Sequence, residues 1–180
     1  MVNINGNIVK SSNANLFIEN RGFTYGDSIF ETIKVNNKPL FWESHYFRLM
    51  SSMRILRMEI PMSFTPEFLE NEIMTLIRSL NSKSKSYRVK FYVYRKYGGF
   101  YTLKSSKIEY MISATNLEHD LYYSDDSEYE IELFKDYLIA PNLLSSLKTN
   151  NKVLNVVGSI FAKENNYENC LLLNTNKNVI

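Results

Sequence analysis

A change in hydrophobic periodicity is the feature that most constrains how this chain can fold. From Ser28 to Val35 a mainly apolar set, Ile29, Glu31, Ile33 and Val35, alternates with Phe30, Thr32 and Lys34, which is typical of a strand with one buried face. From Glu43 to Met58 the apolar spacing is helical, and a second helical pattern begins at Thr65-Pro66. Threonine favours the N-cap position and proline the first helical position. The two periods in one chain predict a mixed α+β fold.

Turn signals divide the strand patterns into hairpins. Asn5-Gly6 stands between two short apolar segments and favours a type I′ turn, whose central residues need a positive φ. The strand at 28–35 reaches Asn36-Asn37, and we expect a second hairpin there that returns through residues 39–42. Two further strands, rich in aromatic and β-branched residues, are expected at 87–94 and 108–115.

The segment 117–128 is the most acidic and polar part of the chain. We interpret it as a linker between a complete small α+β domain at 1–116 and a second domain at 129–180. The second domain combines expected strands with an expected helix at 152–165 whose apolar residues share one face. Because the sequence stops at the start of a strand pattern, we expect 129–180 to be the opening part of a larger domain, and the sequence to be a fragment.

Composition limits the cellular setting and the class of partner. Cys170 is the only cysteine, and no Cys/His ligand spacing occurs, so we expect neither an internal disulfide nor a metal site. No apolar run approaches the roughly 20 residues that span a bilayer. These features predict a cytoplasmic protein. The formal net charge of +2 predicts no general attraction to nucleic acid or membrane.

Lys148 is the first candidate for chemistry, because it lies directly before an amphipathic helical pattern. The positive end of a helix dipole and partial burial both favour the neutral amine, which a Schiff base requires. An ordinary solvated lysine is the alternative. His45 and Arg48 lie one helical turn apart, where they could bind a phosphate or form a surface ion pair.

A basic and aromatic stretch from Lys83 to Lys96 supports a different function. Strand alternation places Arg88, Lys90, Tyr92 and Tyr94 on one side, which could contact nucleic acid. The aromatic motif of RNA-recognition strands is not matched. A non-enzymatic nucleic-acid-binding protein therefore stays as an alternative.

Four motifs in order along the chain resemble one enzyme family. They are Arg21-Gly22-Phe23-x-Tyr25-Gly26-Asp27-x-x-Phe30-Glu31, His45-x-x-Arg48-Leu49, Lys148 before a helix, and Asn169-Cys170-Leu171-Leu172-Leu173-Asn174. The family is the class IV aminotransferases, the fold-type IV pyridoxal phosphate enzymes. It includes branched-chain and D-amino acid aminotransferases and aminodeoxychorismate lyases.

The resemblance implies a cofactor, a reaction and the residues that carry them. Lys148 matches the lysine that forms a Schiff base with pyridoxal 5'-phosphate and moves the proton during turnover. Arg48 matches the arginine that binds the cofactor phosphate, and Asn151 an asparagine that follows the lysine. Phe30 matches an aromatic residue that borders the substrate pocket. The implied reaction moves an amino group between an amino acid and a 2-oxo acid, and the implied assembly is a homodimer.

The sequence departs from the family pattern in two places. Phe100 stands where D-amino acid aminotransferases and some lyases have an arginine that holds the substrate carboxylate, so we expect Arg95, Lys96 or another loop to bind it instead. The family's glutamate at the pyridine nitrogen and its phosphate-binding helix follow later than Ile180, so we expect weak cofactor binding and poor turnover. The alternative within the family is aminodeoxychorismate lyase, which releases pyruvate.

Overall fold

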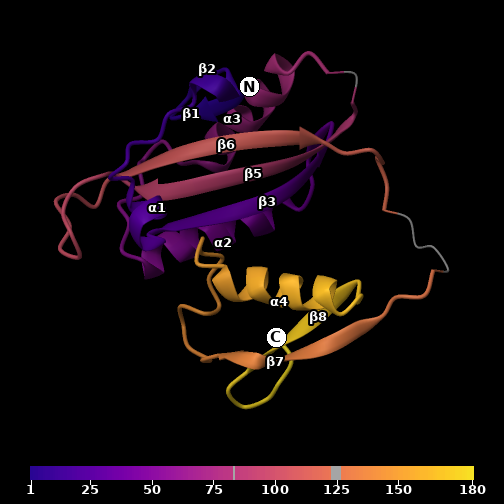
Figure 1. Ribbon diagram of the computed structural model, residues 1–180. Coiled ribbons are helices and arrows are strands. Elements are labelled where there is room, and N and C mark those ends of the chain that lie inside the picture. Colours follow the sequence, from indigo (N-terminus) through magenta and orange to yellow (C-terminus); the bar gives the residue numbers. More distant parts are fainter. Residues whose placement is uncertain (83, 123–126) are drawn as a thin grey trace. The chain divides into compact units, whose positions relative to one another are not determined.

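A computed structural model of the chain describes residues 1–82, 84–122 and 127–180, which form two compact units (Figure 1). The first unit comprises Met1–Tyr122 and the short segment Lys148–Asn150. The second comprises the described residues 127–147 and 151–180. The chain passes between the units within the expected linker, whose residues 123–126 lie outside the described residues, as does Lys83. That 148–150 joins the first unit was not predicted.

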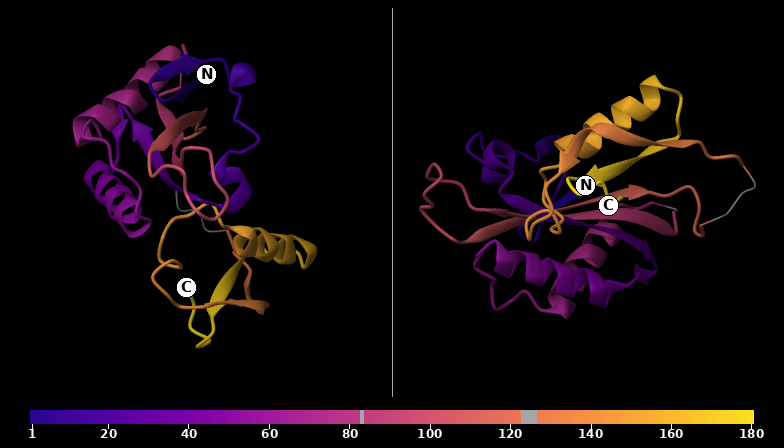
Figure 2. Two further views of the ribbon diagram at one scale, coloured as in Figure 1. Left: turned by 90° about the vertical axis from the view of Figure 1, so that its left-hand side faces the viewer. Right: turned by 90° about the horizontal axis from the view of Figure 1, so that it is seen from below.

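The first unit is built on an antiparallel six-stranded sheet with the order β2-β1-β6-β5-β3-β4. Two helices, α2 and α3, cover one face of this sheet (Figures 1 and 2). The elements are β1 (Val2–Ile4), β2 (Asn7–Val9), the 3-10 turn η1 (Ser11–Asn13), α1 (Arg21–Tyr25), β3 (Ser28–Asn36), β4 (Lys38–Pro39), α2 (Trp42–Ile55), α3 (Pro66–Ser79), β5 (Ser86–Arg95) and β6 (Ile108–Asn116).

The core of the first unit lies between the sheet and the two helices. Alternation along β3 is as predicted, because Ile29, Ile33 and Val35 point into this core and are almost fully buried. The intervening residues, with their neighbours on β5, make up the opposite side, here called the outer face. Its members include Ser28, Phe30, Thr32 and Lys34 of β3 and Arg88, Lys90, Tyr92 and Tyr94 of β5.

Local signals predicted most of these elements. Asn5 and Gly6 have φ of 49° and 88°, which confirms the first hairpin turn. The Thr65 side chain accepts a hydrogen bond from the Phe68 amide at 3.2 Å, which confirms the cap of α3. The second hairpin is confirmed, because Val35 pairs with Pro39 across a turn at Asn37. Its returning strand does not extend to residue 42 as expected, because Phe41 adopts the left-handed conformation with φ of 53° and helix α2 begins directly after it.

The segment before β3 forms a short helix that ends at Tyr25. Residues Arg21–Tyr25 form the short helix α1, capped by the Asn20 side chain, which accepts from the Phe23 amide at 3.0 Å. Gly22 is therefore helical, whereas Gly26, which ends the helix, has a positive φ of 65°.

The second unit pairs β7 (Ile131–Ile139) with β8 (Asn169–Asn174) in parallel, and α4 (Val153–Glu164) connects them. The apolar residues of α4 do not all share a buried face as expected, because Val153, Val156 and Ile160 are exposed. Gly158 and Ala162 are the buried residues of the helix. Among the described helices of the chain, none is long and apolar enough to cross a membrane.

We predict that Gly158→Ala destabilises the second unit. A Cβ at this position would lie 2.9 Å from both Cys170 Sγ and Leu172 Cδ2. The overlap outweighs the better helix propensity of alanine, for a net loss of about 1–2 kcal/mol. Urea unfolding followed by far-ultraviolet circular dichroism measures it, with Ser159→Ala on the exposed side of α4 as the control. Equal stability of the Gly158→Ala and parent chains would contradict the packing.

Candidate active site

Lys148 is held against the sheet by backbone pairing. The Phe30 amide donates to the Lys148 carbonyl at 2.9 Å, and the Asn150 amide donates to the Ser28 carbonyl at 3.1 Å. Thr149 forms an antiparallel bridge with Ile29 between these two bonds. The segment 148–150 therefore extends the sheet locally beside the first half of β3, and the position of the Lys148 backbone is fixed.

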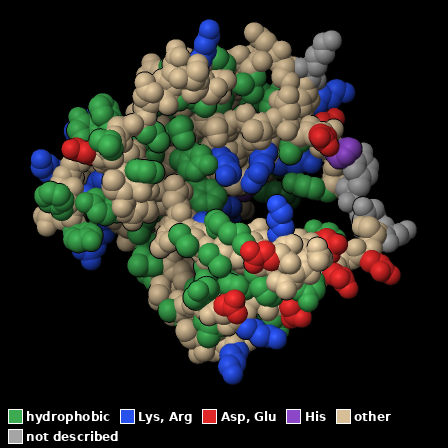
Figure 3. All heavy atoms as spheres, viewed as in Figure 1, with side chains coloured by type: hydrophobic (Ala, Val, Ile, Leu, Met, Phe, Trp, Pro, Cys, Tyr) green, Lys and Arg blue, Asp and Glu red, His purple; other side chains and the backbone are tan. Residues whose placement is uncertain are grey.

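The Lys148 side chain lies over an aromatic surface on the outer face. Its Nζ is 5.2 Å from the centroid of the Phe30 ring, and that ring is 6.0 Å from the ring of Tyr92. Nζ of Lys90 is 5.9 Å from the centroid of each of these two rings. Figure 3 shows Lys and Arg side chains gathered over β3 and β5. The half-buried amine of Lys148 thus shares its aromatic surface with a second cation.

Arg48 is held at the next position of β3 through Glu31. Its Nε donates to Glu31 Oε1 at 2.7 Å, and its Nη2 to Oε2 at 2.5 Å. The Glu31 side chain is only 2% exposed, whereas that of Arg48 is 46% exposed. Arg48 Nη1 takes no part in these bonds to the carboxylate. The inner edge of the guanidinium is therefore fixed by Glu31, and its outer edge can bind an anion.

His45 completes the polar cluster around Glu31. Its Nδ1 lies 2.8 Å from Glu31 Oε2 and 3.0 Å from Arg48 Nη2. Because a carboxylate oxygen can only accept, Nδ1 carries the hydrogen that it donates to Glu31, and Arg48 Nη2, which can only donate, lies beside Nδ1 without a hydrogen bond to it. Burial raises the pKa of Glu31, but the hydrogen bonds from His45 and Arg48 and the arginine charge outweigh it and hold this pKa below its ordinary value. The Glu31 hydrogen bond in turn raises the pKa of Arg48.

We predict that Arg48→Met destabilises the chain in a pH-dependent way. At pH 7 the substitution leaves the buried Glu31 carboxylate without its main counter-charge. The expected loss is about 2–3 kcal/mol, below the usual range for a buried pair because Arg48 is half exposed. Because the pKa of Glu31 is lower in the folded parent than its unfolded value of about 4.5, the ionised carboxylate stabilises the fold at pH values above 4.5. This contribution disappears as the pH falls through the folded pKa.

The difference between Arg48→Met and the parent should therefore shrink below pH 4.5, because a protonated Glu31 needs no arginine. Denaturant titrations at about pH 7 and about pH 3 measure it. Arg54→Met removes an exposed arginine from the same helix and should change stability by less than about 0.5 kcal/mol at either pH. A pH-independent loss would contradict the assignment to Glu31.

Arg95, expected to bind substrate, is committed inside the fold. Its Nε donates to Asp27 Oδ2 at 2.9 Å, and its terminal nitrogens donate to the carbonyls of Leu56 and Arg57 at 2.7 and 3.1 Å. The side chain is 6% exposed. Asp27 Oδ2 also accepts from Arg21 Nε at 2.9 Å. A guanidinium used in this way has a structural role, so we leave Arg95 out of the proposed site.

The structure places the predicted site residues in two groups. Lys148 lies over Phe30 on the outer face, whereas Arg48 is anchored on Glu31, which shares the core-facing side of β3 with Ile29 and Ile33. Asn151 belongs to the second unit and is exposed. Glu31 was not predicted as a site residue, although an acidic residue on the buried side of a strand signals a buried partner. Lys90 was named only for the nucleic-acid alternative, and its place beside Phe30 follows from the register of β5 against β3, which no local pattern reveals.

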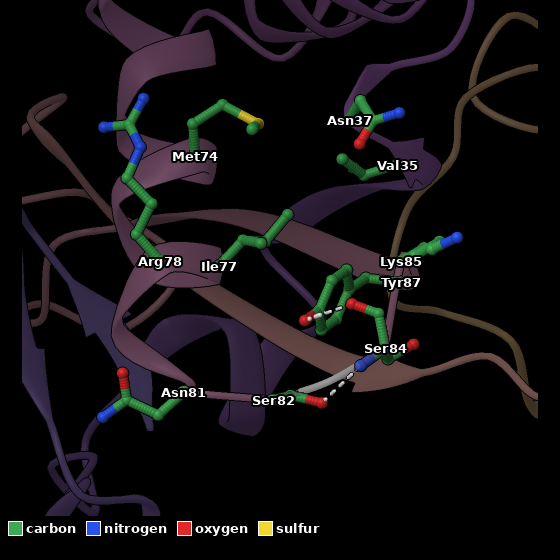
Figure 4. Close-up of a pocket in the computed structure, with 10 residues that line it drawn as sticks. All are labelled: Val35, Asn37, Met74, Ile77, Arg78, Asn81, Ser82, Ser84, Lys85 and Tyr87. Atoms are coloured by element: carbon green, nitrogen blue, oxygen red, sulfur yellow. Dashed lines mark hydrogen bonds between the residues drawn. The ribbon is translucent and has the colours of Figure 1, made fainter.

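A separate hollow lies at the other end of the sheet, where β3 and β5 meet the end of α3 (Figure 4). Its cations do not converge, because the side chains of Arg78 and Lys85 point in different directions. Among the described residues, no three His, Cys, Asp or Glu side chains are placed to hold a metal ion. The hollow is lined by Val35, Asn37, Met74, Ile77, Arg78, Asn81, Ser82, Ser84, Lys85 and Tyr87.

A comparison with protein-family models identifies the family of this chain. A family model described as amino-transferase class IV matches residues 28–180, which include β3, Arg48 and Lys148. The chain belongs to this family. D-alanine aminotransferase of Staphylococcus epidermidis is 25% identical over 165 residues, covering 89% of this chain and 54% of the relative.

Solved structures show that the class IV aminotransferase fold extends along the whole chain. The branched-chain aminotransferase of the archaeon Thermoproteus uzoniensis, with norvaline, matches with a TM-score of 0.81 at 18% identity. The match covers 99% of this chain and 61% of the Thermoproteus chain. A protein from Legionella pneumophila assigned as 4-amino-4-deoxychorismate lyase matches with a TM-score of 0.75 at 21% identity, covering 94% and 60%. This chain spans between about half and three fifths of the length of these relatives.

Proposed function

We propose that this class IV aminotransferase chain takes part in pyridoxal-phosphate-dependent transfer of an amino group between an amino acid and a 2-oxo acid. One observation carries the proposal. The Lys148 amine lies over Phe30, on a backbone that is hydrogen-bonded to β3. A fixed backbone limits the region that the amine can reach to the surface around Phe30, and covalent catalysis by an amine requires such positioning.

The residues present fit pyridoxal 5'-phosphate. The cofactor carries an aldehyde and a phosphate, and this chain offers an amine at Lys148 and a guanidinium at Arg48 whose outer edge is exposed. Asn151 would add an amide near the lysine in sequence. When bound, the cofactor withdraws electrons from the substrate Cα. Arg48 would hold the phosphate, and Glu31 would keep the guanidinium charged and oriented.

The remaining steps fall to side chains on the outer face. In its neutral form the Lys148 amine would accept the proton from the substrate Cα and return it to the product carbon. Phe30, under the amine, would border the substrate and exclude water from the face at which the proton moves. Glu31 has a structural part only, because its carboxylate is bound by His45 and Arg48.

We further propose that the protein acts in the cytoplasm as a homodimer. The segments 16–25 and 97–103 of the first unit present large apolar side chains to solvent. They contact one another through aromatic rings: the ring centroids of Phe17 and Tyr97 are 5.1 Å apart, and those of Tyr25 and Tyr101 are 5.5 Å apart. Exposed aromatic clusters of this kind favour association with a second copy. Sedimentation velocity at several concentrations tests this, and a monomer at all of them would contradict it. The exposed members are Leu16, Phe17, Ile18, Phe23, Phe100 and Tyr101.

The test of the function is a comparison of two assays on the purified chain supplied with pyridoxal 5'-phosphate. A transaminase should form glutamate from 2-oxoglutarate and an amino acid donor. Aminodeoxychorismate lyase, which is favoured by the Legionella neighbour, should release pyruvate from aminodeoxychorismate instead. We expect glutamate formation. Pyruvate release without glutamate would establish the lyase, and salt-dependent RNA binding by a protein without cofactor would establish the nucleic-acid alternative.

A further inference from the structure

A hollow of about 310 Å³ opens on the outer face beside the Lys148 segment. Asn150, two residues after the lysine, forms part of its wall. Every lining residue belongs to the first unit. The hollow is lined by Leu16, Asn20, Gly22, Phe23, Ser28, Tyr92, Tyr94, Met111 and Asn150.

The hollow shares an aromatic wall with the candidate active site. Tyr92 lines it, and the ring of Tyr92 lies 6.0 Å from the ring of Phe30, over which the Lys148 amine is placed. On the neighbouring strand β3, Ser28 lines the hollow two positions before Phe30, so both residues face the same side. A substrate that reacts at Lys148 could therefore place its side chain in this hollow without crossing a strand.

The lining selects for an uncharged group. None of the residues that form the hollow carries a charge, so an acidic or basic side chain would find no counter-charge there. Tyr92, Tyr94 and Met111 offer aromatic and thioether surfaces that contact a flat ring well. Burial and the charge of Glu109 raise the pKa of Tyr94 to about 12, so its hydroxyl stays neutral and able to donate.

One wall contains a polar group without a partner. The Ser28 hydroxyl is buried, and among the described residues it has no hydrogen-bond partner. An unsatisfied buried hydroxyl is costly, and such groups call for an explanation. Gly22 packs against it, since a Cβ there would lie 3.1 Å from Ser28 Oγ and from Asn20 Oδ1. A ligand hydroxyl that reaches this wall would give Ser28 the partner that it lacks.

We propose that this hollow is the subsite for the substrate side chain, and that it takes an uncharged aromatic ring, best a hydroxyphenyl group. The substrate class is then an aromatic amino acid or 2-oxo acid. That the ring belongs to a substrate of Lys148 rests on the proposed function, whereas binding of the ring itself does not.

Ligand-observed NMR on the full chain, without cofactor, tests the subsite with three probes: 4-hydroxyphenylpyruvate, phenylpyruvate and 2-oxoglutarate. We expect the two aromatic acids to bind more tightly than 2-oxoglutarate. Met111→Trp fills the hollow and should weaken both aromatic probes about tenfold, or more, without affecting 2-oxoglutarate. Met62→Trp places the same side chain at an exposed site and should change nothing. Equal binding by Met111→Trp and parent, or a preference for 2-oxoglutarate, would overturn the proposal.

Ser28→Ala tests the hydroxyl separately. It should reduce the preference for 4-hydroxyphenylpyruvate over phenylpyruvate about three- to tenfold, because only the former can bond to Ser28. An unchanged preference would remove Ser28 from the subsite. Lys148→Ala separates the subsite from the reaction. Aromatic probes that bind Lys148→Ala as tightly as the parent support the subsite even if the transaminase assay fails, and loss of their binding in Lys148→Ala overturns it.

Discussion

Asp27→Ala is expected to destabilise the first unit by about 3–5 kcal/mol, the largest effect on stability that we predict for a single substitution. One carboxylate oxygen of Asp27 accepts from Nε of both Arg21 and Arg95, each at 2.9 Å. The two arginine side chains are only 5% and 6% exposed. Removal of Asp27 leaves two buried cations without a counter-charge, and neither can lose its proton to escape the penalty.

Unfolding in guanidinium chloride, followed by Trp42 fluorescence, measures this loss, because the only tryptophan lies in the first unit. Asp27→Asn keeps the shape and one acceptor, so it should recover part of the stability. Glu59→Ala removes an exposed acid and should cost less than about 0.5 kcal/mol. If Asp27→Ala is as stable as Glu59→Ala, the three-residue ion cluster does not hold the unit together.

Lys148→Ala is expected to lower the rate of amino-group transfer at least about a hundredfold, the largest effect on function that we predict. The substitution removes both the amine that would bind the cofactor and the group that would move the proton. The fold should persist, because Lys148 is anchored through its carbonyl and its side-chain contact with Phe30 is worth only about 1 kcal/mol.

Steady-state assays of glutamate formation check this loss, and Lys148→Arg is the matched control. The arginine retains the positive charge over Phe30 but cannot form the bond that an amine forms. Lys148→Arg should therefore be as inactive as Lys148→Ala. Substantial activity in Lys148→Arg would mean that position 148 supplies only charge.

The parts of the fold with strong local signals followed from the sequence. The Asn5-Gly6 turn, the cap at Thr65 and the alternation along β3 are each decided by a few neighbouring residues, and each was predicted correctly. The returning strand expected at 39–42 is shorter than predicted, ending at Pro39, because Phe41 takes a left-handed conformation that no local pattern indicates. The exposed face of α4 shows that an apolar stripe alone does not reveal what it packs against.

The candidate site was harder to predict, because its contacts are long-range. Lys148 and Arg48 could be named from motifs, but their pairing with the adjacent β3 residues Phe30 and Glu31 exists only in the folded chain. Arg95 shows the limit of reasoning from residue type. Arg95 was predicted to bind the substrate carboxylate because position 100 has a phenylalanine where some relatives have an arginine. In the structure its guanidinium is already held by Asp27 and two backbone carbonyls.

The central claim is that the amine of Lys148 is the group that binds the cofactor aldehyde. Borohydride reduction of the chain incubated with pyridoxal 5'-phosphate, followed by peptide mass spectrometry, tests it most directly. We predict that the cofactor becomes fixed to the peptide that contains Lys148, and that Arg48→Met requires more cofactor to reach the same labelling. Labelling spread over exposed lysines, with Lys148 unmodified at saturating cofactor, would contradict it.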